Sequence, residues 1–339
     1  MIDLSDLRRR YRRRLHRKRL LWRAFRKRRE LRIVSDRRGA IAAKDVLALS
    51  VMRNEHLRLP FFLEHYRKLG VGHFLIVDNG STDGTGELLS AQPDVTVWRT
   101  EASYRAARFG MDWLNWLLRR HARGRWAVVA DADELLIYPD WDNRDLRSLT
   151  GWLDRRGIES MGAMMLELYP RGRPGTHCYR AGQDPTEIAG WFDAHGYWAQ
   201  RKPNFQNVCL KGGVRARCFF AEDPDRAPFL NKVPLVRWRA TTAYVNSTHM
   251  LLPVALNRLH GTAGADRPSG LLLHTKFLPD APARAETEKR RQEHFTDAGY
   301  YDVYYDAVSR DPDLWEAEST RYEGWRQLVD LGLMERGPW

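Results

Sequence analysis

The sequence predicts an α/β fold in which helices cover both faces of a mainly parallel sheet. From residue 45 onwards, short apolar runs alternate with segments whose apolar residues recur at helical spacing. Three polar clusters, at residues 53–55, 78–83 and 131–134, each follow an apolar run directly. Strands that alternate with helices form parallel sheets, and ligands bind beyond the carboxyl ends of such strands. We therefore expect one binding site where these clusters meet.

The elements of this pattern can be assigned in order along the chain. The expected strands are residues 46–51, 74–77, 95–98, 126–130, 164–169 and 271–273. The expected helices are residues 59–69, which begin near Pro60 and end at Gly70, a helix that carries Leu88 and Leu89, and residues 104–118. Further along, residues 283–298 form a charged helix. The first four strands with their helices predict the parallel sheet.

Composition bounds the class of protein. The chain has 339 residues, of which 43% are hydrophobic, so it can form a substantial core. Its formal net charge of +13 comes entirely from residues 1–39, which hold 17 Lys or Arg and 4 Asp or Glu residues. The remainder is neutral, so the protein is not basic throughout. The sequence makes no prediction of an oligomeric state.

Residues 1–40 predict a basic amphipathic arm. Leu7, Tyr11, Leu15 and Phe25 belong to a set of apolar residues that recurs at three- and four-residue steps among the arginines. Such helices lie on anionic membrane surfaces, which makes residues 1–39 a candidate membrane contact. A solvated extension without a partner is the alternative. Nucleic acid ranks third, because no base-reading module follows the arm.

Targeting signals and cysteines predict a cytoplasmic protein, peripheral at the inner membrane face if the arm binds there. No apolar stretch follows the basic start, as it would in a secretory signal. No apolar run approaches the roughly 18 residues that a membrane span needs. Cys178, Cys209 and Cys218 are odd in number and lack metal-ligand spacing, which predicts buried thiols in a reducing compartment.

Asp131 and Asp133 are the central candidates for chemistry. They follow the apolar run 126–130 directly, and residues at i and i+2 of an extended backbone point the same way. Two such carboxylates can bind one divalent cation through oxygen. The alternative is a turn whose acids are simply solvated.

The turn after the second strand offers groups for a nucleotide. Asn79 and the neighbouring Ser and Asp residues are short hydrogen-bond acceptors, and Gly80 and Gly84 allow close approach of a ligand to the backbone. The turn lacks both the Gly-x-Gly-x-x-Gly of dinucleotide folds and the Gly-Lys-Ser/Thr of phosphate loops. A nucleotide among acids needs a cation to offset its phosphates, and Asp131 with Asp133 would hold it.

These motifs together resemble a known family. Ser-Val-Met-Arg-Asn-Glu at 50–55, Val-Asp-Asn-Gly-Ser-Thr-Asp-Gly-Thr at 77–85 and Asp-Ala-Asp-Glu at 131–134 are similar to family 2 glycosyltransferases of the GT-A fold, in the branch that opens with Met-Arg-Asn-Glu. The resemblance covers about residues 45–140. Further similar stretches are residues 212–215, 232–238, 247–249 and 273–277.

The resemblance implies roles for particular residues. It assigns to the nucleoside Arg53, Glu55, Asp78, Asn79, Ser81 and Asp83. It implies that Asp131 and Asp133 hold Mn²⁺ or Mg²⁺ against the diphosphate of a nucleotide sugar, with His274 as a third metal or phosphate contact. Lys232 and Lys276 are candidates for pairing with phosphate. A histidine at a strand end and exposed lysines also occur without any such role.

The catalytic base has two candidates. Inverting transfer needs a carboxylate that deprotonates the acceptor hydroxyl. In many family 2 enzymes this acid lies in a Glu-Asp pair after the metal motif, which Glu222 and Asp223 would provide here. Residues 223–226 also read as a surface turn. Glu167 is the rival, because an acid within an apolar strand is partly buried and therefore perturbed.

The predicted organisation is a basic arm at 1–40, a GT-A domain at 41–280 and a helical extension at 281–339 packed on it. The predicted function is metal-dependent, inverting transfer of a sugar to a cell-surface glycan or glycolipid. The aromatic residues at 191–198 are a possible acceptor platform, or packing beneath a loop. The alternatives are a nucleotidyl- or phosphotransferase, and a non-catalytic membrane or nucleic-acid interaction protein with a relic GT-A domain.

Overall fold

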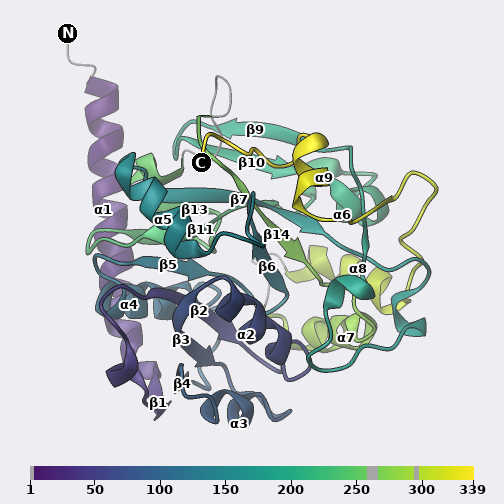
Figure 1. Ribbon diagram of the computed structural model, residues 1–339, viewed down its shortest axis with the longest axis horizontal. Helices are drawn as coiled ribbons and strands as arrows, with labels where there is room; N and C mark the ends of the chain where they lie inside the picture. Colours follow the sequence, from purple (N-terminus) through teal and green to yellow (C-terminus); the bar gives the residue numbers. More distant parts are fainter. Residues whose placement is uncertain (1–3, 258–265, 294–297) are drawn as a thin grey trace.

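The computed structural model describes residues 4–257, 266–293 and 298–339 (Figure 1). Its helices are α1 (Leu4–Lys27), α2 (Leu59–Lys68), α3 (Thr85–Ser90), α4 (Met111–His121), α5 (Leu146–Arg155), α6 (Gly213–Phe219), α7 (Ala281–Arg291), α8 (Ala298–Ser309) and α9 (Trp325–Asp330). Its strands are β1 (Arg32–Ser35), β2 (Val46–Met52), β3 (Val71–Asp78), β4 (Val95–Arg99), β5 (Trp126–Val129), β6 (Glu134–Ile137), β7 (Ser160–Glu167), β8 (Trp191–Phe192), β9 (Trp198–Lys202), β10 (Asn207–Lys211), β11 (Asn231–Arg237), β12 (Ala243–Asn246), β13 (Met250–Leu252), β14 (Gly270–His274) and β15 (Thr320–Arg321). Of the helix predicted over 283–298, α7 forms the first part, and residues 294–297 lie outside the described residues.

The predicted fold class is confirmed. Within the described residues, nine strands form one sheet in the order β1-β4-β3-β2-β5-β11-β7-β14-β6. β4, β3, β2 and β5 are parallel neighbours, and so are β7 and β14. Because β11 is antiparallel to both β5 and β7, all six of these strands point the same way. Their carboxyl ends therefore share one edge of the sheet.

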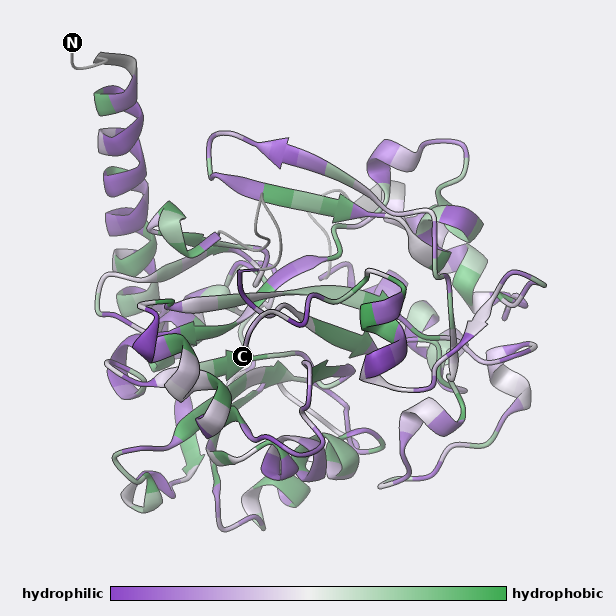
Figure 2. Cartoon of the chain, turned by 45° about the horizontal axis from the view of Figure 1, so that its top comes forward, coloured by the Kyte–Doolittle hydropathy of each residue, from purple (hydrophilic) through white to green (hydrophobic). Residues whose placement is uncertain are grey.

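Helices bury both faces of this sheet. Along β2, Val46 and Ala48 join the core beneath α2, whereas Leu47 and Leu49 join the core beneath α4. Figure 2 shows hydrophobic strands in the middle of the molecule, with hydrophilic residues on the helices and loops around them. Strands that are covered on both faces read as continuous apolar runs, which is why the sequence identifies them well.

The helix predicted from Tyr104 begins later, at Met111. Arg108, Phe109 and Gly110 have φ angles of +56°, +55° and +74°, so the chain makes a left-handed turn before α4. A Cβ on Gly110 would lie 2.7 Å from a side-chain atom of β2, which makes glycine necessary there. The sequence spacing predicted Tyr104 within the helix, but this turn leaves Tyr104 outside it.

The basic segment at the N-terminus joins the main fold. β1 pairs with β4 at the edge of the sheet, and α1 packs on α4. Leu20 and Ala24 of α1 are buried, and Arg23 Nη2 donates a hydrogen bond of 2.8 Å to the buried Asp112 carboxylate. Figures 1 and 2 show that the N-terminal part of α1 continues beyond the body of the molecule.

The C-terminal segment is attached to the sheet by two arginine–carboxylate pairs. Arg58, just before α2, makes two 2.6 Å hydrogen bonds to Asp280 at the start of α7. Arg284 of α7 donates a 2.9 Å hydrogen bond to Glu55, which follows β2. These bidentate pairs fix α7 over the carboxyl edge of the sheet.

Two predictions about the chain as a whole can be compared with the structure. Cys209 is buried, but Cys178 and Cys218 are exposed, so the expectation of three buried thiols is wrong for two of them. Among the described helices, none is both long and apolar enough to cross a membrane.

Candidate active site

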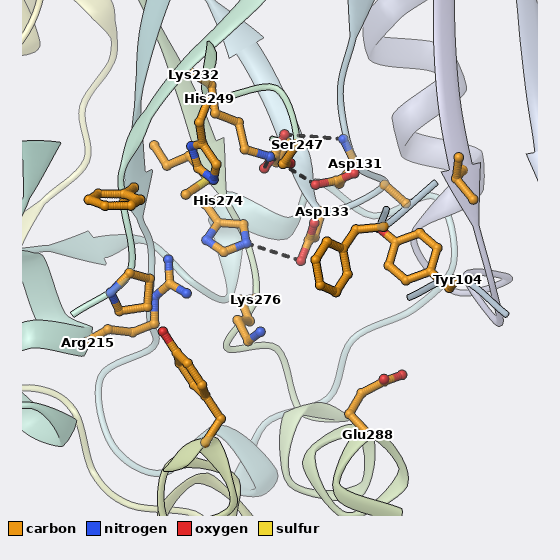
Figure 3. A pocket seen from close by; sticks show the side chains of 18 of the residues that line it. Tyr104, Asp131, Asp133, Arg215, Lys232, Ser247, His249, His274, Lys276 and Glu288 are labelled. Atoms are coloured by element: carbon orange, nitrogen blue, oxygen red, sulfur yellow. Dashed lines mark hydrogen bonds and ion pairs between the residues drawn. The ribbon is translucent and has the colours of Figure 1, made fainter. Parts of the chain in front are cut away.

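A cavity of about 640 Å³ lies at the carboxyl edge of the sheet (Figure 3). Its lining combines the ends of β2 and β3, the turn at 131–134, the end of β14 and one face of α7. The charged side chains in its lining are Arg53, Glu55, Asp131, Asp133, Glu134, Lys211, Arg215, Asp225, Arg226, Lys232, Lys276, Arg284, Glu288 and Arg291. The cavity therefore lies where the three polar clusters of the sequence were expected to meet.

Strand register places three titratable residues in a row at this edge. His274 of β14 is opposite Glu134 of β6 on one side and opposite Glu167 of β7 on the other. Each of the three ends or begins its strand. Residues that are more than 100 positions apart thus become neighbours through strand pairing alone.

Asp131 and Asp133 both line the cavity, but not on an extended backbone as expected. They lie in a tight turn between β5 and β6, in which the Glu134 N–H donates a 3.0 Å hydrogen bond to the Asp131 carbonyl. Figure 3 shows both carboxylates on the same wall, with His274 beside Asp133. The predicted proximity is therefore present, and a turn produces it.

Lys232 of β11 stabilises this turn by contacting two of its acids. Its Nζ donates a 2.9 Å hydrogen bond to Asp131 Oδ2 and a second hydrogen bond to Glu134 Oε1. Burial opposes a charge on Lys232, but the two carboxylates raise its pKa above the ordinary value, so the amine stays protonated. Burial in turn raises the pKa of Glu134 to about 7. Lys232, predicted as a phosphate contact, is thus already engaged by two acids.

His274 is held between two acids. Its Nε2 lies 3.3 Å from Asp133 Oδ2, and its Nδ1 lies 3.5 Å from Glu167 Oε1. Burial opposes protonation, but Asp133 and Glu167 outweigh it and raise the pKa of His274 above the ordinary value. The pKa of Asp133 falls well below its usual range, because His274 and Lys276 outweigh the effect of burial. The contact therefore favours the charged form of each residue.

The donor atoms on this wall suit a hard divalent cation. Asp131 and Asp133 offer oxygens, which Mn²⁺ and Mg²⁺ accept. Both ring nitrogens of His274, the third predicted metal contact, already face carboxylates. Among the residues that the structure describes, no three His, Cys, Asp or Glu side chains come together as a complete metal site. A cation bound by one or two carboxylates together with substrate phosphate and water needs no such cage. The residues fit a substrate-dependent metal site.

Of the six predicted nucleoside residues, three line the cavity. Arg53, Glu55 and Asn79 do so, and Arg53 Nη1 donates a 2.8 Å hydrogen bond to the Asn79 carbonyl. The other three are used to build the turn: Asp78 accepts the Ser81 N–H, Ser81 accepts the Asn54 N–H, and Asp83 accepts the His56 N–H. The structure does not bring Asp78, Ser81 or Asp83 to the cavity wall.

Lys276 is the cation in the cavity with the weakest protein attachment. Among the described residues it makes no hydrogen bond or ion pair, and its Nζ lies 5.8 Å from the centre of the Tyr304 ring. Burial, with Arg215 nearby, lowers its pKa to about 8. Figure 3 shows Lys276 between the wall of Asp133 and Glu288 of α7. A partly buried ammonium that no carboxylate contacts directly is costly, so an anionic ligand would stabilise it.

The two predicted bases lie away from the cavity. Glu167 is buried behind His274 and forms an ion pair with Arg215. Although burial opposes ionisation, Arg215 and His274 lower the pKa of Glu167, which therefore serves to fix these two cations. Asp223 is exposed to solvent and pairs with Arg226 at 3.0 Å. From the same turn, Asp225 lines the cavity instead.

Two further parts of the lining were not assigned from the sequence. Tyr104 and Phe109, in the left-handed turn before α4, form an aromatic wall with ring centres 6.0 Å apart. Arg284, Glu288 and Arg291 line the other side from one face of α7. Their spacing of four and three residues predicts that they share one face of a helix. Nothing in the sequence connected that helix to the sheet edge.

A second cavity of about 420 Å³ is lined in part by the same elements as the first. Gly213 and Arg217 of α6 line it, whereas Arg215 of the same helix lines the first cavity. Pro224 lines the second cavity and the next residue, Asp225, lines the first. The other residues that line it are Asp193, Ala194, His195, Gly196, Trp198, Ala216, Ala221, Glu316 and Glu318.

Comparisons with known proteins add little to this description. No family model matches the chain, and no curated protein is similar to it in sequence. Structural comparison finds a crystal structure of 4-diphosphocytidyl-2C-methyl-D-erythritol synthase with 13% sequence identity and a TM-score of 0.27, covering 86% of this chain and 99% of that chain. A likeness this distant carries no argument about function. The resemblance to family 2 glycosyltransferases therefore stays a prediction.

Proposed function

We propose that this protein transfers a sugar from a nucleotide-sugar donor to a hydroxyl group of a glycan or glycolipid. The observation that supports this most is the composition of the cavity wall. Asp131 and Asp133, suited to a divalent cation, lie at a sheet edge beside Lys276, an ammonium that forms no ion pair within the described part of the chain. A metal-bound diphosphate matches both parts of that wall, since the metal would bind the two acids and the phosphate would bind Lys276.

The nucleoside is assigned to the end of the cavity nearest β2 and β3. Arg53 and Asn79 supply polar groups there, and Tyr104 with Phe109 supplies an apolar aromatic surface. A nucleobase needs both, because its edges form hydrogen bonds and its faces stack on aromatic rings.

The diphosphate is assigned to the space between Asp133 and Lys276. A divalent cation held by Asp131 and Asp133 would offset negative charge on the departing nucleoside diphosphate. Lys276 binds a phosphate oxygen, and Lys232 keeps the carboxylate of Asp131 in place. His274 orients Asp133 through the 3.3 Å contact.

Asp225 is the proposed base. It lines the first cavity and follows Pro224, which lines the second cavity, and its side chain forms no ion pair with another described residue. Glu288 also lines the cavity but pairs with Arg291 at 2.8 Å. Asp225 would accept the proton of the acceptor hydroxyl as its oxygen forms a bond to the anomeric carbon and the diphosphate leaves. One base on the face opposite the leaving group gives inversion.

The acceptor is assigned to the second cavity. Trp198 offers a ring on which the face of a sugar can pack, and Glu316 and Glu318 offer acceptors for hydroxyl groups.

A nucleotidyl- or phosphotransferase is the second candidate, because the first cavity holds more cations than a diphosphate requires. Arg215, Arg284 and Arg291 could accompany Lys276 around a triphosphate. The products separate the two functions. Sugar transfer glycosylates the acceptor and releases a nucleoside diphosphate. Nucleotidyl transfer from a nucleoside triphosphate releases pyrophosphate, whereas phosphoryl transfer from it phosphorylates the acceptor and releases a nucleoside diphosphate.

The test is to incubate the protein with UDP-, GDP-, CMP- and dTDP-sugars, with and without Mn²⁺, and to identify products by mass spectrometry. We expect Mn²⁺-dependent release of the nucleotide from one donor, and a product of inverted anomeric configuration once an acceptor is supplied. Turnover of nucleoside triphosphates alone, with pyrophosphate as product, would replace this proposal by the second candidate. Binding without turnover of any donor would favour the non-catalytic alternative.

A further inference from the structure

The outer face of α1 carries an apolar stripe that no part of the described protein covers. The five large apolar residues Leu7, Tyr11, Leu15, Trp22 and Phe25 are each between 45% and 62% exposed. They are separated by four, four, seven and three residues, so they fall within a sector roughly 80° wide on an α-helix. Phe25 contacts the body of the protein through the edge of Trp116.

The opposite face of the same helix is the one that holds it to the protein. Leu20 and Ala24 are buried there, and Arg23 is bound to Asp112. At 3.6 residues per turn, this buried face points away from the exposed stripe. The helix therefore has two apolar sides, and folding of the chain uses only one of them.

Charge surrounds the exposed stripe. α1 contains twelve Lys or Arg residues and one acid, Asp6. Helical geometry places Arg8, Arg19 and Arg26 along one border of the stripe, and Arg10 and Arg14 along the other. Long basic side chains at such borders can lie along an apolar surface while their charged ends reach anionic groups.

We propose that α1 docks the protein onto an anionic lipid surface, with the stripe of Leu7, Tyr11, Leu15 and Trp22 entering the headgroup region. Apolar side chains flanked by arginines match an interface whose interior is apolar and whose surface is negative. Lys18 falls within the stripe, between Leu15 and Trp22, and is the one charged residue there. A nucleic acid would use the charge but has no use for the apolar side chains of the stripe. The docking surface lies on an element other than the strand ends that form the cavity, so this inference does not depend on the proposed reaction.

The experiment uses the full chain, because Leu20 and Ala24 make α1 part of the fold and its removal would disturb the core. Binding is measured by flotation with phosphatidylcholine vesicles, with and without phosphatidylglycerol. The apolar variant carries Leu7→Gln, Tyr11→Gln and Leu15→Gln, since glutamine preserves helix formation. The charge variant carries Arg8→Gln, Arg10→Gln and Arg14→Gln. Val303→Gln, at a side chain of α8 that is 72% exposed, is the matched control.

We expect the wild type and Val303→Gln to bind the anionic vesicles equally, and to bind phosphatidylcholine alone weakly. The apolar variant should bind at least about tenfold more weakly, because three of the inserted side chains are lost. The charge variant should lose roughly fivefold per removed arginine. Circular dichroism should show unchanged helix content in both.

Three results would overturn the inference. The first is that the stripe makes no difference to binding: the apolar variant binds anionic vesicles as tightly as the wild type, or the wild type does not bind them at all. The second is tight binding of a DNA or RNA duplex that the charge variant loses and the apolar variant keeps, which would assign α1 to nucleic acid. The third is a dimer in light scattering that the apolar variant converts to a monomer, which would assign the stripe to a second copy of the chain.

Discussion

Nε2 of His274 lies 3.3 Å from Oδ2 of Asp133, and the antiparallel register of β14 with β6 brings the two together. His274 belongs to β14, which is the last strand of the central sheet in sequence order, and it fixes the turn after β5. Lys232 of β11 fixes the same turn through Asp131. The candidate metal-binding acids are thus oriented before any ligand arrives, which is the property that an active site requires.

Replacement of Lys232 should destabilise the fold strongly. Lys232→Met leaves the buried Glu134 without its cation, and removal of one partner from a buried ion pair costs about 3–5 kcal/mol. Lys289→Met is the matched control, because the pair of Lys289 with Asp306 is largely solvated and should contribute at most about 1 kcal/mol. Urea unfolding measures both free energies. Equal losses for the two variants would mean that Lys232 is not a structural cation.

Replacement of Lys276 should separate ligand binding from stability. Lys276→Met should weaken binding of the nucleoside diphosphate about ten- to a hundredfold, the range for loss of a charged hydrogen bond. Its melting temperature should stay equal or rise, because burial already disfavours the charge on this amine. Lys276→Arg should retain most of the affinity. Unchanged affinity in Lys276→Met, measured by calorimetry, would exclude a phosphate contact at this position.

The two neighbouring acids Asp223 and Asp225 provide a matched test of the base. Asp225→Asn should lower kcat by about a hundredfold or more, since general base catalysis contributes factors of that order. Nucleotide affinity should not change. Asp223→Asn should keep full activity, because Asp223 is exposed and away from the cavity. If Asp223→Asn is the inactive variant, the assignment within this turn is reversed.

Acid should destabilise the protein through buried histidines. His65 donates from Nε2 to the Leu136 carbonyl at 2.9 Å, and burial lowers its pKa to about 4. An unfolded histidine binds a proton near pH 6.5, so between about pH 6.5 and 4 the unfolded state binds more protons and stability falls as pH falls.

His65→Gln should therefore reduce the slope of unfolding free energy against pH in that interval, by up to about 1.4 kcal/mol per pH unit. A slope in His65→Gln identical to that of the wild type would show that His65 does not titrate with folding.

Much of the fold could be predicted because its signals are local. The apolar runs at β2, β3, β4 and β5 are buried on both faces, and polar residues follow each of them. The rule that ligands bind at the carboxyl edge then located the cavity correctly. The short turn at 131–134 was predicted as extended backbone, because two acids separated by one residue give the same pattern in either conformation.

Other parts of the site depend on pairings that the sequence does not display. β11 runs antiparallel between β5 and β7, and this reversal brings Glu167 and His274 to the same edge as Asp131. The sequence predicted that burial would perturb the pKa of Glu167, and the pKa is indeed shifted. Its partner Arg215 could not be predicted, because it lies on a helix that begins 46 residues later. The left-handed turn at 108–110 likewise broke a regular helical spacing.

The central claim is that the acids at 131–133 bind a divalent cation together with a nucleoside diphosphate. The most direct test is calorimetric titration of the preferred nucleoside diphosphate into the wild type and into Asp133→Asn, each with and without Mn²⁺. We predict that Mn²⁺ strengthens binding to the wild type about tenfold or more, as expected for a coupling of roughly 1.4 kcal/mol, and that Asp133→Asn loses this gain while keeping its melting temperature within a few degrees. Equal affinity with and without Mn²⁺ in the wild type, or the same gain in Asp133→Asn, would contradict the account.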